Sequence, residues 1–246
     1  MFAYTSKSEA EACLVAISEV SQSGVRVKRS LELSPLVLSI PFDPSKFEVF
    51  SKARVEYGRL LGVNGVAAIN RTDRVYTSSK GRITKPSYRE RLENYPDVVS
   101  RPVLLNSVNQ IDKISEEMSR CPRASNHSFV FMRPADLYEK RRPGYVPCPI
   151  AGDFKLRKGS ISLNVMFRSC DVLNFLYSDI YYLRRLQREV LDKVTLINEE
   201  KFLNKTRIGD MNLFLSRAFI QTWEIKDPRG YVGLVEDAKE FLSKIV

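Results

Sequence analysis

Residues 153–167 carry the pattern that most restricts the fold of this chain. Apolar and polar side chains alternate from Ile161 to Phe167, which predicts a strand with one buried face. The Lys158-Gly159 pair before it is typical of a tight turn, and residues 153–156 can form the strand that precedes the turn. The sequence therefore predicts a β-hairpin, and a sheet must form part of the fold.

Segments with the apolar spacing of amphipathic helices lie on both sides of this hairpin. Ser8 and Glu11 fit a capping box at the start of the first one. Helices are expected over residues 8–23, 47–61, 103–118, 179–196 and 234–246. One or two strands are expected over residues 25–40, and one strand each over residues 129–132 and 211–225. The chain has no internal repeat and no long linker, so we expect one α+β domain over residues 1–246, with a mixed sheet packed against helices.

Several side chains are expected to have structural roles only. Cys13 falls on the apolar face of the first helix and Cys170 between two polar residues, so both are expected to pack. His127 is expected to be a satisfied structural histidine. Three arginines on one side of the helix over residues 179–196 are expected to form a solvated face: Arg184, Arg185 and Arg188.

The charge balance indicates an anionic partner. Lys and Arg number 39 and Asp and Glu 29, which gives a net charge of +10. A nucleic acid and a phosphorylated small molecule both fit this excess, and part of it lies in the basic segment 71–91. With 43% apolar residues the chain has ample material for a core, so whole-chain disorder is excluded.

Other classes of protein are disfavoured by specific absences from the sequence. No stretch approaches the ~18 uncharged apolar residues of a membrane helix, and the first residues lack a secretion signal, so a cytoplasmic protein is expected. The four cysteines form no Cys-x-x-Cys pair, and His127 is the single histidine. We therefore expect neither a zinc site nor a disulfide framework.

Two motifs carry candidate chemistry. Pro147-Cys148 precedes the hairpin, and Arg168-Ser169 ends its second strand. An Arg-Ser pair at the end of a strand can bind a phosphate through charge and a hydroxyl donor. A cysteine whose pKa is lowered by a nearby arginine can act as a nucleophile.

At these residues the chain resembles the thymidylate synthase family, over about half its length. The family has Pro-Cys before a hairpin, here Pro147-Cys148, and then Arg-Ser-x-Asp-Val, here from Arg168 to Val172. A base-reading residue follows at Asp179, and a Gly-Asp pair, Gly209-Asp210, opens a later strand. The resemblance implies a thymidylate-synthase-like fold, a homodimer, and a reduced folate such as 5,10-methylenetetrahydrofolate, or a related pterin, as cofactor.

The resemblance also implies roles for individual residues. Cys148 would add to C6 of a pyrimidine nucleoside monophosphate and make C5 nucleophilic toward a one-carbon unit. Arg168 and Ser169 would hold the 5′-phosphate, and Asp171 would hydrogen-bond to the pyrimidine. Asp179 stands where thymidylate synthases carry Asn. Cytidylate hydroxymethylases of the family carry Asp there, because a carboxylate accepts from the amino group of cytosine.

Three further residues correspond to weaker parts of the family pattern. Glu56 lies where the family places a proton-relaying glutamate, and Tyr88 lies in a segment similar to its Tyr-Gly-x-Arg. Arg123 corresponds to the arginines that reach the phosphate of the neighbouring subunit.

The chain also departs from the family. Pro149 replaces the His that usually follows the catalytic Cys. Phe219 and Gln221 replace the ribose-contacting His and Tyr. Trp223 is the single tryptophan, so the usual folate-lining tryptophans are missing.

Three functions stay open at the level of the sequence. The first is 5-hydroxymethylation of CMP or dCMP through a covalent adduct of Cys148. The second is a thymidylate synthase that methylates dUMP with a divergent pterin site. The third is a homologue that binds a nucleotide or RNA without catalysis, which the net charge and the lost sugar and folate residues support. We favour an enzyme over a nucleic-acid-binding protein, because the cysteine is retained together with the phosphate-binding arginine.

Overall fold

The computed structural model describes residues 2–78, 86–96, 107–133, 136, 146–203, 205–222 and 230–246. Residues 79–85 of the basic segment, residues 103–106 of the helix expected from residue 103, and residues 223–225 of the expected strand, with Trp223, lie outside the described residues. The chain contains helices and a mixed sheet, so the α+β fold class is confirmed.

Two compact units, each built from segments that are separated in sequence, make up the chain. Unit 1 comprises residues 1–72, 166–184 and 210–246, and unit 2 comprises residues 73–165 and 185–209. The boundaries fall inside helices and strands rather than in linkers. The single domain expected over residues 1–246 stays a prediction.

In unit 1 a mixed sheet is built from β1 (Phe2–Thr5), β4 (Leu36–Ile40) and β11 (Arg207–Leu215). β1 pairs parallel with β4, and β11 pairs antiparallel with β4, with Leu213 opposite Leu38. A second sheet joins four short strands in the order β10, β12, β3 and β2. Their bounds are Cys170–Asp171, Ala218–Gln221, Ser30–Leu33 and Val25–Val27.

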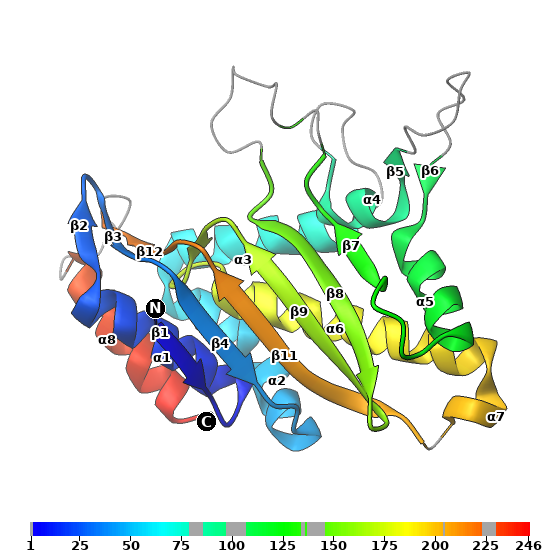
Figure 1. Ribbon diagram of the computed structural model, residues 1–246. Helices are drawn as coiled ribbons and strands as arrows, with labels where there is room; N and C mark the ends of the chain where they lie inside the picture. The colour runs from blue at the N-terminus through cyan, green and yellow to red at the C-terminus, as the bar shows by residue number, and fades with distance from the viewer. Residues whose placement is uncertain are drawn as a thin grey trace. The chain divides into compact units, whose positions relative to one another are not determined.

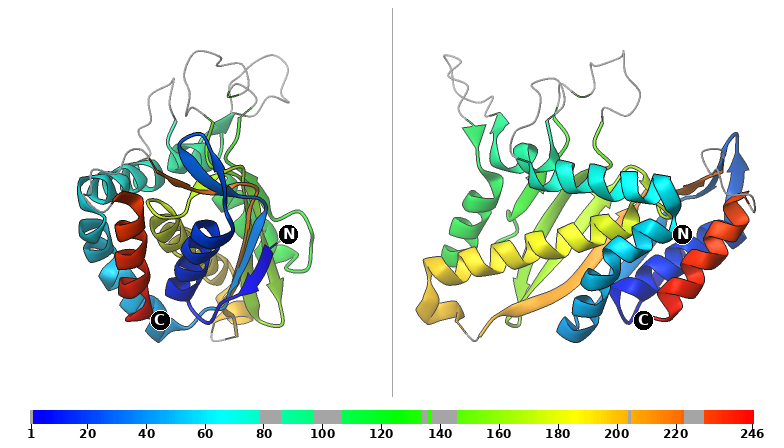
Figure 2. Two further views of the ribbon diagram at one scale, coloured as in Figure 1. Left: turned by 90° about the vertical axis from the view of Figure 1, so that its left-hand side faces the viewer. Right: turned by 180° about the vertical axis from the view of Figure 1, so that it is seen from behind.

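Helices α1 (Glu9–Ser23) and α8 (Gly230–Ser243) pack together on one face of the β1-β4-β11 sheet (Figure 1). The Ser8 side chain accepts a hydrogen bond from the Glu11 N–H, 3.1 Å, which confirms Ser8 as the cap of α1. No described helix of unit 1 lies on the opposite face (Figure 2). The core of this unit therefore lies between its helices and one face of its sheet, and Cys13 is fully buried there, as expected.

The remaining helices of unit 1 continue the chain around this core. They are α2 (Pro44–Leu60), most of α3 (Gly62–Thr77) and the first part of α6 (Leu176–Ile197). α2 follows an N-cap aspartate, Asp43, and has Pro44 in its first turn, where the missing N–H costs no hydrogen bond. Among the described residues, none of the helices combines the length and apolar composition needed to cross a membrane.

Unit 2 contains the predicted hairpin. β8 (Pro149–Arg157) and β9 (Ser160–Phe167) are joined at Lys158 and Gly159, whose φ angles are 49° and 71°. Both residues are in the left-handed region that a tight hairpin turn requires, and glycine adopts this region without strain. β7 (Ser128–Val130) pairs antiparallel with β8, so the strand order is β9-β8-β7.

The other elements of unit 2 are short, apart from α5 and the end of α6. They are α4 (Tyr88–Glu93), β5 (Tyr95–Pro96), β6 (Ser107–Val108), α5 (Gln110–Arg120) and α7 (Glu199–Phe202). Gln187 of α6 donates to the carbonyls of Ile161 and Gly209, at 2.6 and 3.1 Å, and so fixes the helix against two strands.

Several expected boundaries are wrong. The expected helix over residues 103–118 begins only at Gln110, because Asn109 caps it and residues 107–108 form a strand. The segment 25–40 forms three strands, and the strand expected over residues 211–225 is two, β11 and β12, with residues 216–217 between them. α6 begins at Leu176 rather than at Asp179.

The expected solvated face on α6 is wrong at Arg184. Its side chain and that of Glu9 are both 0% exposed, with Arg184 Nε 2.7 Å from Glu9 Oε1. Arg184 also donates to the carbonyls of Ile40 and Pro41, at 2.8 and 2.9 Å. Arg185 and Arg188 are exposed as expected.

Candidate active site

Cys148 lies directly before β8 in unit 2 and is half-buried. Its backbone N–H donates a hydrogen bond to the Tyr88 hydroxyl oxygen, 3.2 Å away. Pro149 follows it as the first residue of β8, and its ring restricts the backbone. Two contacts therefore hold the segment around the thiol. Strand β8 begins directly after Cys148, and the Tyr88 hydroxyl binds the backbone of Cys148 itself.

Tyr88 is positioned by helix α4 and by an aromatic cluster. It is the first residue of α4, whose cap Ser87 accepts a hydrogen bond from the Glu90 N–H, 3.0 Å. Its ring packs edge-on against Tyr76, with ring centroids 4.9 Å apart, and tilted against Phe131, at 5.5 Å. The apolar ring of Tyr88 is thus packed among aromatic side chains, and its polar hydroxyl is left to bind the backbone of Cys148.

A buried ion pair holds α4 in place. Both guanidinium nitrogens of Arg91 bind the carboxylate of Asp136, at 2.6 and 2.9 Å, and one of them also donates to the Phe131 carbonyl at 2.7 Å. The side chains are 2% and 4% exposed. Loss of either partner would leave a buried charge uncompensated, which typically costs about 3–5 kcal/mol. The position of Tyr88 thus depends on a rigid support.

The Arg-Ser-Cys-Asp segment lies in unit 1, after β9. Arg168 is half-buried, and Ser169 and Asp171 are buried. The Asp171 carboxylate accepts from the backbone N–H groups of Leu173 and Asn174, both at 3.2 Å, and from the Asn174 side chain at 2.9 Å. Asp171 therefore organises the turn that leads from β10 into α6.

Asp179 is in the first turn of α6 and is 5% exposed. The Cys170 thiol lies 3.8 Å from one of its carboxylate oxygens and acts as a weak donor. Burial raises the pKa of the Cys13 thiol well above its usual value, with further contributions from the charges of Glu9 and Asp179. Cys170 was expected only to pack; it also faces the proposed base-reading carboxylate.

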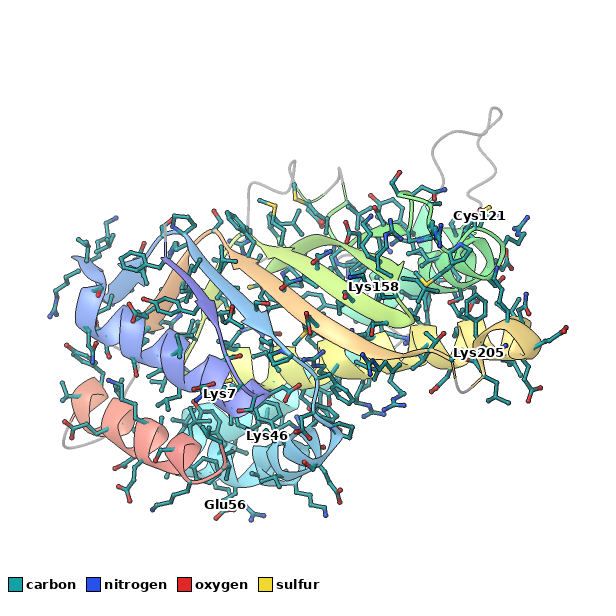
Figure 3. All side chains as sticks on the ribbon, turned by 60° about the horizontal axis from the view of Figure 1, so that its bottom comes forward. Lys7, Lys46, Glu56, Cys121, Lys158 and Lys205 are labelled. Carbon is teal, nitrogen blue, oxygen red and sulfur yellow. The ribbon has the colours of Figure 1, made fainter. Side chains whose placement is uncertain are left out.

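Glu56 is exposed on α2, and Figure 3 shows its side chain directed outward. The next residue, Tyr57, is buried, and its hydroxyl donates to the Leu173 carbonyl at 2.9 Å. Its ring stacks on Tyr177 with centroids 4.6 Å apart. Burial raises the Tyr57 pKa well above its usual value, so the phenol stays protonated and can donate. The proton-relay role of Glu56 stays a prediction.

Arg123 does not lie near Cys148 within unit 2. Its backbone carbonyl accepts a hydrogen bond from the Arg157 guanidinium, 3.1 Å. Arg157 is the last residue of β8 and Cys148 precedes the first, so a strand of nine residues, roughly 30 Å long, separates them. Arg123 and Cys148 of one chain therefore lie at opposite ends of β8, and the phosphate role of Arg123 stays a prediction.

The structure thus brings together two sets of predicted residues. Cys148 and Tyr88 meet in unit 2, and Asp171 and Asp179 lie on either side of one turn in unit 1. Sequence reasoning missed Tyr57. The seven-residue spacing between Phe50 and Tyr57, which places both on one face of α2, was a usable signal.

The described residues contain no group of three or more His, Cys, Asp or Glu side chains placed to hold a metal ion. None of the four cysteines, all of which are described, is in a disulfide.

No protein-family model matches this sequence. The chain is 31% identical over 109 residues to a protein of Methanosarcina barkeri named "Putative thymidylate synthase", and 28% identical over 109 residues to a protein of the same name from Methanosarcina acetivorans. In both comparisons the matched part is 44% of this chain and 44% of the relative. The chain therefore spans less than half the length of the curated relatives it matches. The similarity supports a thymidylate-synthase-like relationship and does not extend to the hydroxymethylase subtype.

Proposed function

We propose that this protein transfers a one-carbon unit to C5 of a pyrimidine nucleotide, and that it converts CMP or dCMP to the 5-hydroxymethyl derivative. The similarity to two proteins named as thymidylate synthases supports the general reaction. The buried carboxylate of Asp179 is the observation that carries the choice of cytosine.

Cys148 is the nucleophile in this proposal. Its thiolate forms a bond to C6 of the pyrimidine, and the electron pair displaced onto C5 attacks the one-carbon unit. A base would then remove the C5 proton, and the electron pair left at C5 would break the bond between the one-carbon unit and its carrier. Water would add to the resulting exocyclic carbon, and the S–C6 bond would break as the C5=C6 double bond re-forms. A thiolate suits both addition and departure, because it is strongly nucleophilic and a better leaving group than an alkoxide. Tyr88 positions the nucleophile by holding the backbone N–H of Cys148.

Asp179 selects the base. An ionised carboxylate only accepts hydrogen bonds, which suits the exocyclic amino group of cytosine and a protonated N3. Uracil presents a carbonyl oxygen at the same position, and two acceptors repel. Because Asp179 is 5% exposed, little water is available to relieve that repulsion, and discrimination is stronger than at the surface.

The nucleotide phosphate is assigned to Arg168 and Ser169, through a guanidinium and a hydroxyl donor. Asp171 is assigned to the pyrimidine, although its oxygens already accept from residues 173 and 174. A reduced folate or related pterin supplies the one-carbon unit when bound. The described residues include none of the tryptophans that the family uses for it, so no residue is assigned to this cofactor.

A homodimer is part of the proposal. In unit 1, one face of the β1-β4-β11 sheet bears no described helix and carries small, polar and apolar side chains. These are Ala3, Thr5, Val37, Ser39, Asn212 and Phe214. A second copy that covers this face would bury Val37 and Phe214 and could bring Arg123 to the neighbouring phosphate.

A thymidylate synthase acting on dUMP is the second candidate, favoured by the names of both relatives. Release of tritium from C5 of CMP, dCMP, UMP and dUMP distinguishes the two. We expect release from a cytosine nucleotide, loss of release in Cys148→Ala, and normal release in a matched control at the exposed cysteine, Cys121→Ala.

Each result has a definite meaning. Release from a uracil nucleotide only would replace the hydroxymethylase with a thymidylate synthase. An Asp179→Asn variant that gains release from dUMP would support the assigned role of the carboxylate. No release from any of the four nucleotides, with or without a reduced folate, would rule out the proposed chemistry and leave a binding protein.

A further inference from the structure

Five exposed cations gather at one end of the β8–β9 hairpin in unit 2. We call them the hairpin patch: Arg123, Arg157, Lys158, Lys205 and Arg207.

Hydrogen bonds and backbone distances show that these residues are neighbours. The Arg157 guanidinium donates to the carbonyls of Pro122 and Arg123, at 3.3 and 3.1 Å. The Arg207 N–H donates to the Gly159 carbonyl at 2.9 Å, and a Cβ built at Gly159 would lie 2.7 Å from the Lys205 carbonyl oxygen. The hairpin turn at Lys158 therefore joins both halves of the patch. Figure 3 shows Lys158 at this turn and Lys205 in the segment before β11.

No described carboxylate is paired with a cation of the patch. Their hydrogen bonds go to neutral groups: Arg157 to backbone carbonyls, Lys205 to the Glu200 carbonyl and Arg207 to the Ser160 hydroxyl. The acidic side chains nearby already have partners, since Asp153 binds Lys155 and Glu117 binds Lys113 and Arg120. Glu199 and Glu200 of α7 are also close, since Lys205 bonds to the Glu200 carbonyl, but neither carboxylate pairs with a cation of the patch.

A buried histidine lies beside this region. His127 is 0% exposed, and its pKa is lowered by burial first and then by the charges of Lys155 and Arg157, while Glu117 and Asp153 act in the opposite direction. The histidine therefore lies among charges of both signs.

The basic segment that the sequence suggested, 71–91, is different. Arg89 binds Glu189 through two nitrogens, at 2.5 and 3.0 Å, and Arg91 is buried against Asp136. These two charges are neutralised within the protein, whereas the cations of the hairpin patch form no ion pair with a described carboxylate.

We propose that the hairpin patch binds the phosphodiester backbone of a nucleic acid. Three of its five cations are arginines, whose planar guanidinium donates two parallel hydrogen bonds to one phosphate. The interface core of a protein partner would need aromatic or apolar anchors, and the patch contains none. A polymer of regularly spaced phosphates meets an all-cationic surface without such anchors. Apart from Arg123, the cations of the patch have no role in the proposed nucleotide chemistry, so this activity does not depend on it.

Fluorescence anisotropy with a short labelled DNA duplex tests the proposal. We compare the wild-type protein with the triple variant Lys158→Gln, Lys205→Gln, Arg207→Gln, over salt from about 50 to 200 mM. The logarithm of the association constant should fall linearly with the logarithm of the salt concentration, with a slope of about −0.9 for each phosphate contact. The triple variant should bind at least about tenfold more weakly and show a slope shallower by about 3.

The matched control removes two charges from unit 1, Lys7→Gln with Lys46→Gln, both labelled in Figure 3. It should keep the wild-type slope. If the triple variant melts at a lower temperature than wild type, the single variants Lys158→Gln and Lys205→Gln carry the test, each with a slope change of about 1.

Three outcomes would overturn the proposal. One is a triple variant that binds like wild type, and another is a control that loses as much affinity as the triple variant. The third is competition by polyglutamate as effective as that by the duplex, which would assign the patch to an acidic polypeptide. Tritium release should be unchanged in the triple variant, so failure here is distinguishable from failure of the proposed enzyme activity.

Discussion

At the scale of single residues, Tyr88 gives the most direct test of how Cys148 is held. Tyr88→Phe removes the oxygen that accepts the Cys148 N–H and leaves the aromatic packing in place. We expect tritium release to fall about tenfold or more, because the loss of one hydrogen-bond partner costs about 1–3 kcal/mol where the donor is left buried. The initial rate at saturating nucleotide measures this loss.

Tyr95→Phe is the matched control. The Tyr95 hydroxyl also bonds to a single backbone group in unit 2, the Met132 carbonyl at 3.1 Å, rather than to Cys148 itself. Its removal should change stability by a similar amount and leave the rate unchanged. Equal rate losses in the two variants would show that Tyr88 acts on stability alone.

His127 gives a prediction about pH. It was expected to be satisfied, but it is buried and neither ring nitrogen has a hydrogen-bond partner among the residues that the structure describes. Its pKa is below the usual value of 6.5, mainly because of burial. As the pH falls below 6.5, the unfolded chain binds a proton that the folded chain does not, so the free energy of unfolding should decrease.

His127→Phe should reduce this dependence and should stabilise the protein at neutral pH by about 1 kcal/mol, because it removes two unsatisfied buried polar atoms. Urea unfolding between pH 5.5 and pH 7.5, which spans the usual histidine range, measures both effects. The same pH dependence in variant and wild type would assign it to other groups.

At the scale of elements, helix α6 has both a buried arginine and exposed arginines, and its sequence alone does not distinguish them. Arg184, Arg185 and Arg188 are the same residue type on one helix, yet only Arg184 is buried, against Glu9. Arg184→Met should destabilise the protein by about 3–5 kcal/mol, because it leaves the Glu9 carboxylate buried without its cation. The midpoint of urea unfolding gives the change in the free energy of unfolding.

Arg188→Met, at the exposed position one turn later, should change stability by no more than about 0.5 kcal/mol. A double variant, Glu9→Gln with Arg184→Met, should recover most of the loss, because it removes the unpaired charge. Failure of the double variant to recover would show that the packing of Arg184, not its charge, stabilises α6.

Patterns within a few residues of sequence predicted correctly those elements that depend only on contacts between sequence neighbours. The hairpin at Lys158 and the cap at Ser8 depend on contacts within a few positions, and both are confirmed. The wrong assignments depend on distant partners. Arg184 is buried because Glu9, 175 positions away, faces it, and no local pattern encodes that pairing.

At the scale of the whole molecule, the motif from Arg168 to Val172 led to the thymidylate-synthase-like relationship that the two relatives support. The contact between Tyr88 and Cys148 joins residues 60 positions apart. Sequence placed both in one candidate site through the resemblance, but the hydrogen bond itself depends on how α4 packs against α5 and β7. The unpaired cations of the hairpin patch were equally invisible, because ion pairing is a property of the folded chain.

The proposed homodimer gives the last prediction. Val37 and Phe214 are directly opposite each other on the face of the β1-β4-β11 sheet that carries no described helix. If a second copy covers this face, Val37→Lys places an uncompensated charge in an apolar contact and should dissociate the dimer. Sedimentation should then show the mass of one chain in place of two. Because Arg123 lies far along β8 from Cys148 of its own chain, dissociation should also reduce tritium release.

Val25→Lys is the control. Val25 is 69% exposed in β2 of the same unit, so this variant should leave the mass unchanged. A wild-type protein that sediments as one chain yet releases tritium at the full rate would show that each chain is complete by itself.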